Sequence, residues 1–264
     1  MNDPSLAVAV RAARNAAAVI ADAAQDLKRL PASSGGHREI VKAADKEAED
    51  AIATTISSAF PEHSIVGKNR VADASSGGPS WRWIVDAIDG TANFAHGYPH
   101  YAISIALVHG SEITHAVVLD PLRDELFTAA KNRGALLNGV VLRVSACTSL
   151  ERALVGTVVP AHGSRKLGPY LSVFGALART SAGIRRGGAC ALDLAYLAAG
   201  RLDGFWVMSV KPWDVAAGAL LVRESGGRVG DFAGGADFLR GEEIIAAAPG
   251  VFNALREAIA AAVA

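Results

Sequence analysis

The chain has 264 residues, enough to bury one substantial core or two halves that share an interface. Lysine plus arginine and aspartate plus glutamate both number 26, so the formal net charge of zero gives no electrostatic footprint for nucleic acid or an anionic membrane. Hydrophobic residues make up 51%, but no run approaches the roughly 20 apolar residues that a membrane span needs. The start lacks the order of a signal peptide, and Cys147 and Cys190 have neither metal-site spacing nor a disulfide framework. These features predict a soluble, cytoplasmic protein.

The predicted elements change in character at about residue 150. Helices are expected over 5–30 and from about Ala44 to Phe60, with a flexible break at 31–36 and a mobile loop rich in Gly and Ser over 67–80. Short strands follow at 82–86, 101–109, 113–119 and 124–129, and one more is expected over 134–144, with a turn at Asn138-Gly139. The later segments alternate as strands 153–158, 203–208 and 243–247 and helices 167–178, 190–199, 213–226 and 249–262. This pattern predicts a single compact unit, 1–264, with an α+β half (1–148), an α/β half (149–264) and a site at their junction.

The segment Asp86–Phe94, DAIDGTANF, carries the strongest functional signal. It follows an apolar, aromatic run that predicts a buried strand, and its two carboxylates, Asp86 and Asp89, could supply hard oxygen ligands for Mg²⁺. The N–H groups of Gly90 and Thr91 could face a phosphate oxygen. Asp-Gly is also a common turn, and Asp or Thr often only caps a helix, so the segment alone also fits a purely structural role.

A second segment, 211–218 (KPWDVAAG), favours the functional interpretation. Pro212 suits the first turn of a helix, and Asp214 then lies in that turn, where an anion is stabilised. Two separate helix starts, one in each half, therefore present carboxylates.

Together these segments resemble the inositol monophosphatases, within the lithium-sensitive, metal-dependent phosphatases. The matching pieces are residues 83–94, 120–121, 127–129, 134–139, 185–188, 191–196, 203–205, 213–218 and 224–227. The sequence of these motifs is most similar to the bacterial extragenic-suppressor branch of the family. The resemblance implies a layered αβαβα sandwich of the inositol monophosphatase/fructose-bisphosphatase type, usually a homodimer, that hydrolyses phosphate monoesters with Mg²⁺.

The resemblance also implies a metal site. Asp86, Asp89 and Asp214 correspond to three carboxylates around one Mg²⁺. Asp86 and the carbonyl of Ile88 correspond to ligands of a neighbouring metal.

Further positions correspond to substrate contacts. The N–H groups of Gly90 and Thr91 would hold the phosphate, and Thr91 with Asp45 would polarise the attacking water. Cys190 falls where the family places a small residue whose backbone touches substrate, although a buried, inert thiol is the simpler interpretation.

The chain departs from the family pattern around this site. The usual Gly-Glu-Glu before the strand is replaced by Gly67-Lys68-Asn69, and the lost Glu is a ligand of the metal that carries the nucleophilic water. Val41-Lys42 replaces Val-Thr, and the usual Lys about a turn upstream is missing. Val207 stands where a Glu commonly binds sugar hydroxyls, so poor selection for a polyol is expected.

Three hypotheses for Lys68 remain open. Its ammonium could project into the site and stand in for one metal, because convergent carboxylates need cations. It could instead be a solvated residue of a mobile loop, or Asp73 could supply the missing carboxylate. One Mg²⁺ site is therefore expected intact, and the second and third depend on which hypothesis holds.

The functional prediction is a Mg²⁺-dependent phosphomonoesterase similar to inositol-1-monophosphatase, acting on a small phosphorylated metabolite. Weakened activity or a changed substrate is expected, such as another sugar phosphate, a histidinol phosphate or a nucleotide phosphate. The alternative is a non-catalytic relative that binds a transcription antitermination complex; only this alternative involves nucleic acid or the transcription machinery. No membrane partner is expected.

Overall fold

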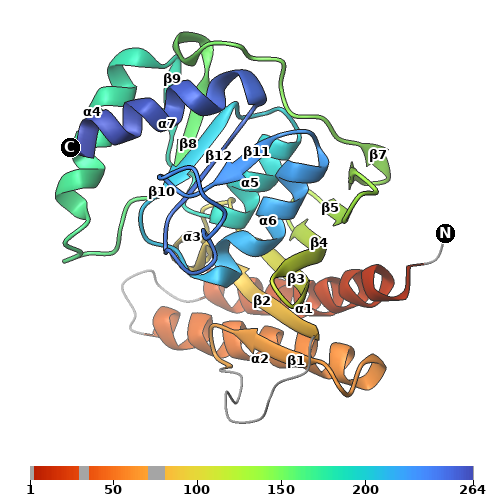
Figure 1. Ribbon diagram of the computed structural model, residues 1–264. Coiled ribbons are helices and arrows are strands. Elements are labelled where there is room, and N and C mark those ends of the chain that lie inside the picture. The colour runs from red at the N-terminus through yellow and green to blue at the C-terminus, as the bar shows by residue number, and fades with distance from the viewer. Residues whose placement is uncertain (1–2, 30–35, 71–80, 264) are drawn as a thin grey trace.

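The computed structural model describes residues 3–29, 36–70 and 81–263, which form five stacked layers (Figure 1). Helices α1 (Pro4–Arg29) and α2 (Gly36–Ala59) form an outer layer against a seven-stranded sheet. Helices α5 (Cys190–Ala198) and α6 (Pro212–Glu224) lie between this sheet and a five-stranded one, and α4 (Leu167–Thr180) and α7 (Pro249–Val263) cover the far side. This order confirms the predicted αβαβα sandwich.

The first sheet has strand order β1-β2-β3-β4-β5-β6-β7. Its strands are β1 (Ser64–Gly67), β2 (Trp81–Asp89), β3 (Ala102–His109), β4 (Glu112–Asp120), β5 (Glu125–Ala130), β6 (Ala135–Leu137) and β7 (Val140–Val141). All neighbours are antiparallel except β1, which pairs in parallel with β2. Helices cover both faces, which explains why β2 is almost continuously apolar before its first aspartate. The predicted segment 134–144 is two short strands around the Asn138-Gly139 turn.

The second sheet has strand order β11-β12-β10-β8-β9. It contains β8 (Leu154–Thr157), β9 (Gly183–Arg185), β10 (Gly204–Val207), β11 (Arg228–Gly230) and β12 (Ile244–Ala247), and a short 3₁₀ turn, η1 (Leu150–Arg152), precedes it. Strands β9, β8 and β10 are parallel, and β12 runs antiparallel to β10 and β11. The sequence did not predict β1, β9 or β11, because in three or four residues a periodic pattern is weak, and these strands lack the almost fully apolar, buried run of β10 and β12.

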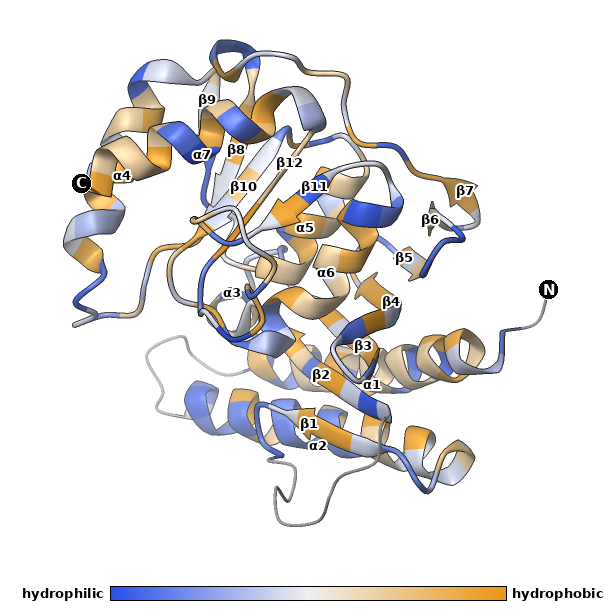
Figure 2. Ribbon diagram, viewed as in Figure 1, coloured by the Kyte–Doolittle hydropathy of each residue, from blue (hydrophilic) through white to orange (hydrophobic). Residues whose placement is uncertain are grey.

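Helix α2 begins eight residues earlier than predicted, at Gly36 rather than Ala44. Its first turns carry His37, Arg38 and Glu39, and Val41 is its first buried residue, so the hydrophobic pattern begins later than the helix. Figure 2 shows the resulting contrast between polar and apolar residues along α2.

The predicted mobile loop 67–80 is ordered at its start. Gly67 and Arg70 exchange both backbone hydrogen bonds, so Lys68 and Asn69 form the tip of a tight turn. The rest of that loop, including Asp73, and the predicted break, apart from Gly36, lie outside the described residues. No helix within the described ranges is long and apolar enough to cross a membrane.

Candidate active site

Strand β2 delivers Asp86 and Asp89 to the boundary between the two halves, and both side chains are buried. Side chains three residues apart in a regular strand point to opposite faces, but the pairing of β2 with β3 shifts register between these two residues. This irregularity changes the direction of the side chains at the end of β2. Asp86 Oδ1 accepts a hydrogen bond from the N–H of Ile88 at 3.2 Å.

Gly90 turns the chain from β2 into α3 (Thr91–Ala95) with φ of 90°, a conformation that favours glycine. A Cβ here would lie 3.0 Å from the carbonyl oxygen of His100 and 3.1 Å from Cβ of Ala189, closer than ordinary contacts. The close approach brings the start of α3 beside the segment that leads into α5.

Asp89 joins the two halves directly. Its carboxylate accepts backbone hydrogen bonds from the first turn of α5, from Cys190 at 3.0 Å, Ala191 at 2.8 Å and Leu192 at 3.3 Å. Asp214 likewise serves a helix start, since its Oδ2 accepts the N–H of Lys211 at 2.7 Å. Both carboxylates therefore have the capping role that the sequence left open, and they are fixed in orientation by it.

Lys68 points into the carboxylate cluster. Its Nζ lies 2.9 Å from Asp45 Oδ2 and 2.8 Å from the Thr91 hydroxyl oxygen, and its side chain is 36% exposed. Thr91 in turn donates its hydroxyl hydrogen to the carbonyl of Ile88 at 3.1 Å. The ammonium thus bridges the two residues to which the family resemblance gives the activation of water, while the Lys68 side chain stays partly open to solvent.

A second buried acid on α2, Glu49, lies one helical turn after Asp45 and was not predicted from the sequence. Asn69 donates to Glu49 Oε2 through its backbone N–H at 3.0 Å and its side-chain amide at 3.1 Å, and to Asp45 Oδ2 at 3.4 Å. The i, i+4 spacing of the two acids on one helix face was the signal that could have found Glu49.

The electrostatics of the cluster show an excess of negative charge. Burial raises the pKa of Asp86 to about 7, against the lowering effect of Lys68, and Asp214 and Asp45 raise it further. Burial, with the charges of Asp86 and Asp214, holds the pKa of Asp89 well above its usual range. Burial also raises the pKa of Asp214.

The single positive charge of Lys68 does not neutralise the carboxylates of this cluster. Burial opposes the charge of Lys68, but Asp45, with smaller effects from Asp86 and Asp214, still raises its pKa. The other oxygen of Asp45, Oδ1, is buried and has no hydrogen-bond partner among the described residues.

This donor set fits Mg²⁺, which prefers carboxylate and carbonyl oxygens. Within the described residues, no three His, Cys, Asp or Glu side chains already form a cage for an ion. The hydrogen bonds of Asp89 and Asp214 partly explain why these side chains do not converge on one point, since their oxygens face backbone N–H groups.

The two predicted substrate-pocket residues are buried. Val207 is 1% exposed, within the apolar core between the sheets, and offers almost no surface to a ligand in this conformation. Cys190 lines the same core, and burial raises the pKa of its thiol well above the usual value. A cavity of about 830 Å³ adjoins Thr91 on the side of α1 and α2, and its wall is mostly apolar, including Leu27, Val41, Phe94 and Tyr101.

Comparison with known proteins agrees with the resemblance seen in the sequence. The model of the inositol monophosphatase family matches residues 1–264. The chain is 45% identical over 255 residues to the Nus factor SuhB of Pseudomonas aeruginosa, covering 96% of this chain and 94% of that protein. It is 41% identical over 252 residues to the Nus factor SuhB of Escherichia coli K12, again with 96% and 94% covered.

Solved structures give the same result. The extragenic suppressor protein suhB of Bartonella henselae superposes with a TM-score of 0.87 at 36% identity, over 98% of this chain and 100% of that one. The inositol monophosphatase of Anabaena sp. PCC 7120 gives a TM-score of 0.86 at 32% identity, over 97% and 95%. The fold is the layered αβαβα type that these solved structures share. The chain belongs to the inositol monophosphatase family.

Proposed function

We propose that this protein is a Mg²⁺-dependent phosphate monoesterase in which Lys68 takes the place of one metal ion. Family membership supports the reaction type, and the buried carboxylates with raised pKa values support the need for cations. The observation that carries the Lys68 assignment is its ammonium, within 3 Å of both Asp45 and Thr91.

Asp86, Asp89 and Asp214 would hold Mg²⁺, with the carbonyl of Ile88 as a further oxygen ligand. When bound, Mg²⁺ would cancel phosphate charge and lower the pKa of a bound water. The chain's own N–H groups at Gly90 and Thr91 orient the phosphate.

Asp45 and Thr91 are suited to take the proton of an attacking water and to orient it. In this structure the ammonium of Lys68 contacts both, so a water between them must share or replace its contacts. We therefore expect slow hydrolysis, because the replaced metal ion is one electrostatic element of the catalytic site. Each such element commonly lowers the activation free energy by about 2–4 kcal/mol. Asp73 as a substitute ligand remains a hypothesis, outside the described residues.

A panel of phosphate monoesters assayed with Mg²⁺ and with Mn²⁺ tests this proposal. The panel includes inositol, sugar, histidinol, nucleotide and aryl phosphates, the last because of the apolar cavity beside Thr91. We expect slow hydrolysis that EDTA abolishes, with inositol phosphate a poor substrate because Val207 offers no polar contact. Asp214→Asn should remove the activity, and Asp26→Asn, an exposed change on α1, should not. Hydrolysis that persists in EDTA would contradict the proposal.

A second candidate function is a non-catalytic role in transcription antitermination. It is favoured by the relatives named Nus factor SuhB at 41–45% identity and by the ammonium within the proposed catalytic cluster. Inactivity on the whole panel, together with retention of purified antitermination factors on the immobilised chain, would select this candidate. Homodimer formation and a cytoplasmic location remain predictions for either candidate.

A further inference from the structure

The first turn of α5 is held against the first half of the chain by a set of buried polar contacts outside the proposed metal and phosphate ligands. We propose that Asn93, His100 and Asp193, here called the clasp, are positioning residues that keep the α5 N–H groups aimed at Asp89. The inference deepens the proposed function, because it rests on Asp89 being part of the cation site.

Asn93 joins two segments with one side chain. Its Nδ2 donates to the carbonyl oxygen of His100 at 2.6 Å and to that of Gly187 at 2.9 Å. Asn93 belongs to α3, immediately after the proposed phosphate cradle, and Gly187 belongs to the segment that leads into α5. One amide therefore ties the cradle to the start of α5.

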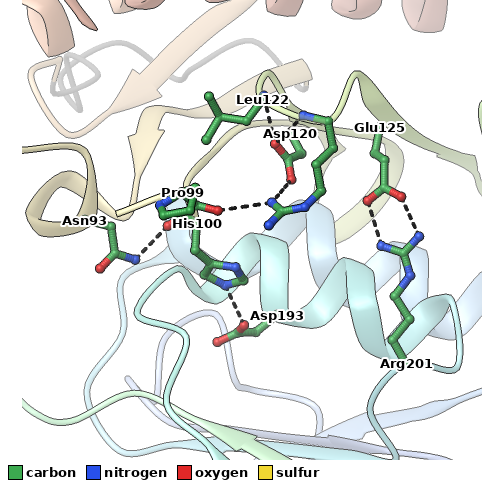
Figure 3. Close-up of polar contacts among 9 residues, drawn as sticks. Asn93, Pro99, His100, Asp120, Leu122, Glu125, Asp193 and Arg201 are labelled. Atoms are coloured by element: carbon green, nitrogen blue, oxygen red, sulfur yellow. Dashed lines mark hydrogen bonds and ion pairs between the residues drawn. The ribbon is translucent and has the colours of Figure 1, made fainter. Parts of the chain in front are cut away.

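His100 and Asp193 close the clasp from the other side (Figure 3). His100 Nε2 lies 2.9 Å from Asp193 Oδ1, and both side chains are largely buried. A Cβ on Gly187 would overlap Asp193 Oδ1 and His100 Nε2, so the pair packs directly on the glycine backbone. Asp193 Oδ2 has no hydrogen-bond partner in the described part of the chain, so His100 is the side chain that fixes this carboxylate.

The same turn of α5 supplies the three N–H donors of Asp89. One of them binds Oδ1 and two bind Oδ2, which leaves Oδ1 with lone-pair capacity toward a cation. If the clasp opens, these donors shift and the carboxylate loses its fixed orientation. Asn93 and His100 then affect cation binding through α5 without touching the cation.

A matched control lies at the other end of the same helix. Arg201 follows α5 and makes a two-point ion pair with Glu125 on β5, at 2.6 Å and 2.5 Å (Figure 3). This pair also joins the two halves, but in the described part of the chain neither side chain has a hydrogen bond to Asp89 or to the first turn of α5. The Arg201 side chain reaches α5 through the ring of Tyr196, beyond that turn, and this ring meets the edge of His100.

Amide hydrogen exchange at Cys190, Ala191 and Leu192, combined with calorimetric titration of Mn²⁺, tests the clasp in the full chain. We expect about tenfold faster exchange and about tenfold weaker Mn²⁺ binding in Asn93→Ala and in His100→Leu, the scale of one lost hydrogen bond. His100→Gln should restore both, because its amide can still donate to Asp193, and Arg201→Gln should change neither.

Unchanged Mn²⁺ affinity in the two clasp variants would overturn the inference, as would an equal loss in Arg201→Gln. The His100→Leu and His100→Gln pair keeps the test decisive if Asn93→Ala does not fold. A wild-type chain that binds no Mn²⁺ would contradict the proposed function instead. The exchange rates would then still show whether the clasp holds α5.

Discussion

At the residue scale, Lys68 and Asn69 are two replacements that act in the same way. Where the family pattern has two glutamates, this chain has two hydrogen-bond donors, and each is paired with a carboxylate of α2. Lys68 contacts Asp45, and Asn69 contacts Glu49. The turn that carries them leaves little freedom, because a Cβ on Gly67 would lie 2.9 Å from the Glu49 carboxylate. The donors are therefore directed into the cluster by the backbone.

The two cysteines should differ sharply in reactivity. Cys190 is buried, and burial raises the pKa of its thiol, whereas Cys147 is partly exposed. Because the thiolate is the nucleophile, iodoacetamide at pH 8 should modify Cys147 in the native chain and Cys190 only after denaturation. Peptide mass spectrometry of the alkylated protein checks this, and early labelling of Cys190 would show that the core around α5 opens readily.

At the element scale, α5 and α6 pack unusually closely around one glycine. A Cβ on Gly218 would overlap the side chain of Leu194, whereas a Cβ on Gly175 of α4 would meet the Arg179 side chain at an ordinary contact distance of 3.7 Å. Gly218→Ala should therefore destabilise the fold by about 1–3 kcal/mol through overpacking, despite the better helix propensity of alanine.

Gly175→Ala is the matched control, and it should stabilise the fold by about 0.5–1 kcal/mol. Chemical denaturation of both variants measures the difference. A neutral Gly218→Ala would mean that the two central helices can move apart at little cost.

The contact between the α2–β1 turn and β2 should make stability depend on pH. Trp83 Nε1 donates to His63 Nδ1 at 3.0 Å, and the imidazole stacks on Phe60 with ring centroids 4.8 Å apart. Burial lowers the pKa of His63 below its usual value of 6.5. The neutral ring is thus favoured by folding, and its contribution is complete above about pH 6.5 and declines as the pH falls from there toward the lower folded pKa.

Unfolding free energies measured between pH 5 and 7.5 test this dependence. The rise with pH should be smaller in His63→Asn, which does not titrate and can keep an acceptor for Trp83. An identical pH dependence in both proteins would assign the effect to other groups.

The sequence predicted long periodic elements well and short ones poorly. Helices α1, α4, α5, α6 and α7 lie within two residues of their expected bounds, because each has a clear apolar face or an N-terminal signal. Strand β1 escaped prediction because its four residues gain their stability from pairing with β2, which no local pattern reveals.

In the candidate site, too, residues in local motifs could be predicted and residues that depend on distant contacts could not. The motifs around Asp86 and Asp214 named the residues that the fold brings together, since each motif is local. Glu49 and the clasp were not found as such, because their roles depend on contacts 20 to 94 residues apart in the chain. The direction in which the Lys68 side chain points could not be predicted either, because it depends on the geometry of the turn from Gly67 to Arg70.

At the scale of the whole molecule, the site exists only where the layers meet. The first sheet supplies Asp86 and Asp89, α2 supplies Asp45, and the second half supplies Asp214 with the N–H groups of α5. Three apolar cores hold these layers in register, one on each side of the first sheet and one beyond the second. A cation bound at this point, as proposed, would stabilise the junction itself, and its binding would report on the whole assembly.

The number of Mn²⁺ ions bound per chain tests the central claim most directly. Isothermal titration of the wild type and of Lys68→Glu compares a site that contains the ammonium with one that contains a carboxylate. We predict one more ion per chain in Lys68→Glu, and no added ion in Lys68→Met, which removes the charge without adding a ligand. Equal ion counts in the wild type and Lys68→Glu would contradict the claim that Lys68 occupies the place of a metal.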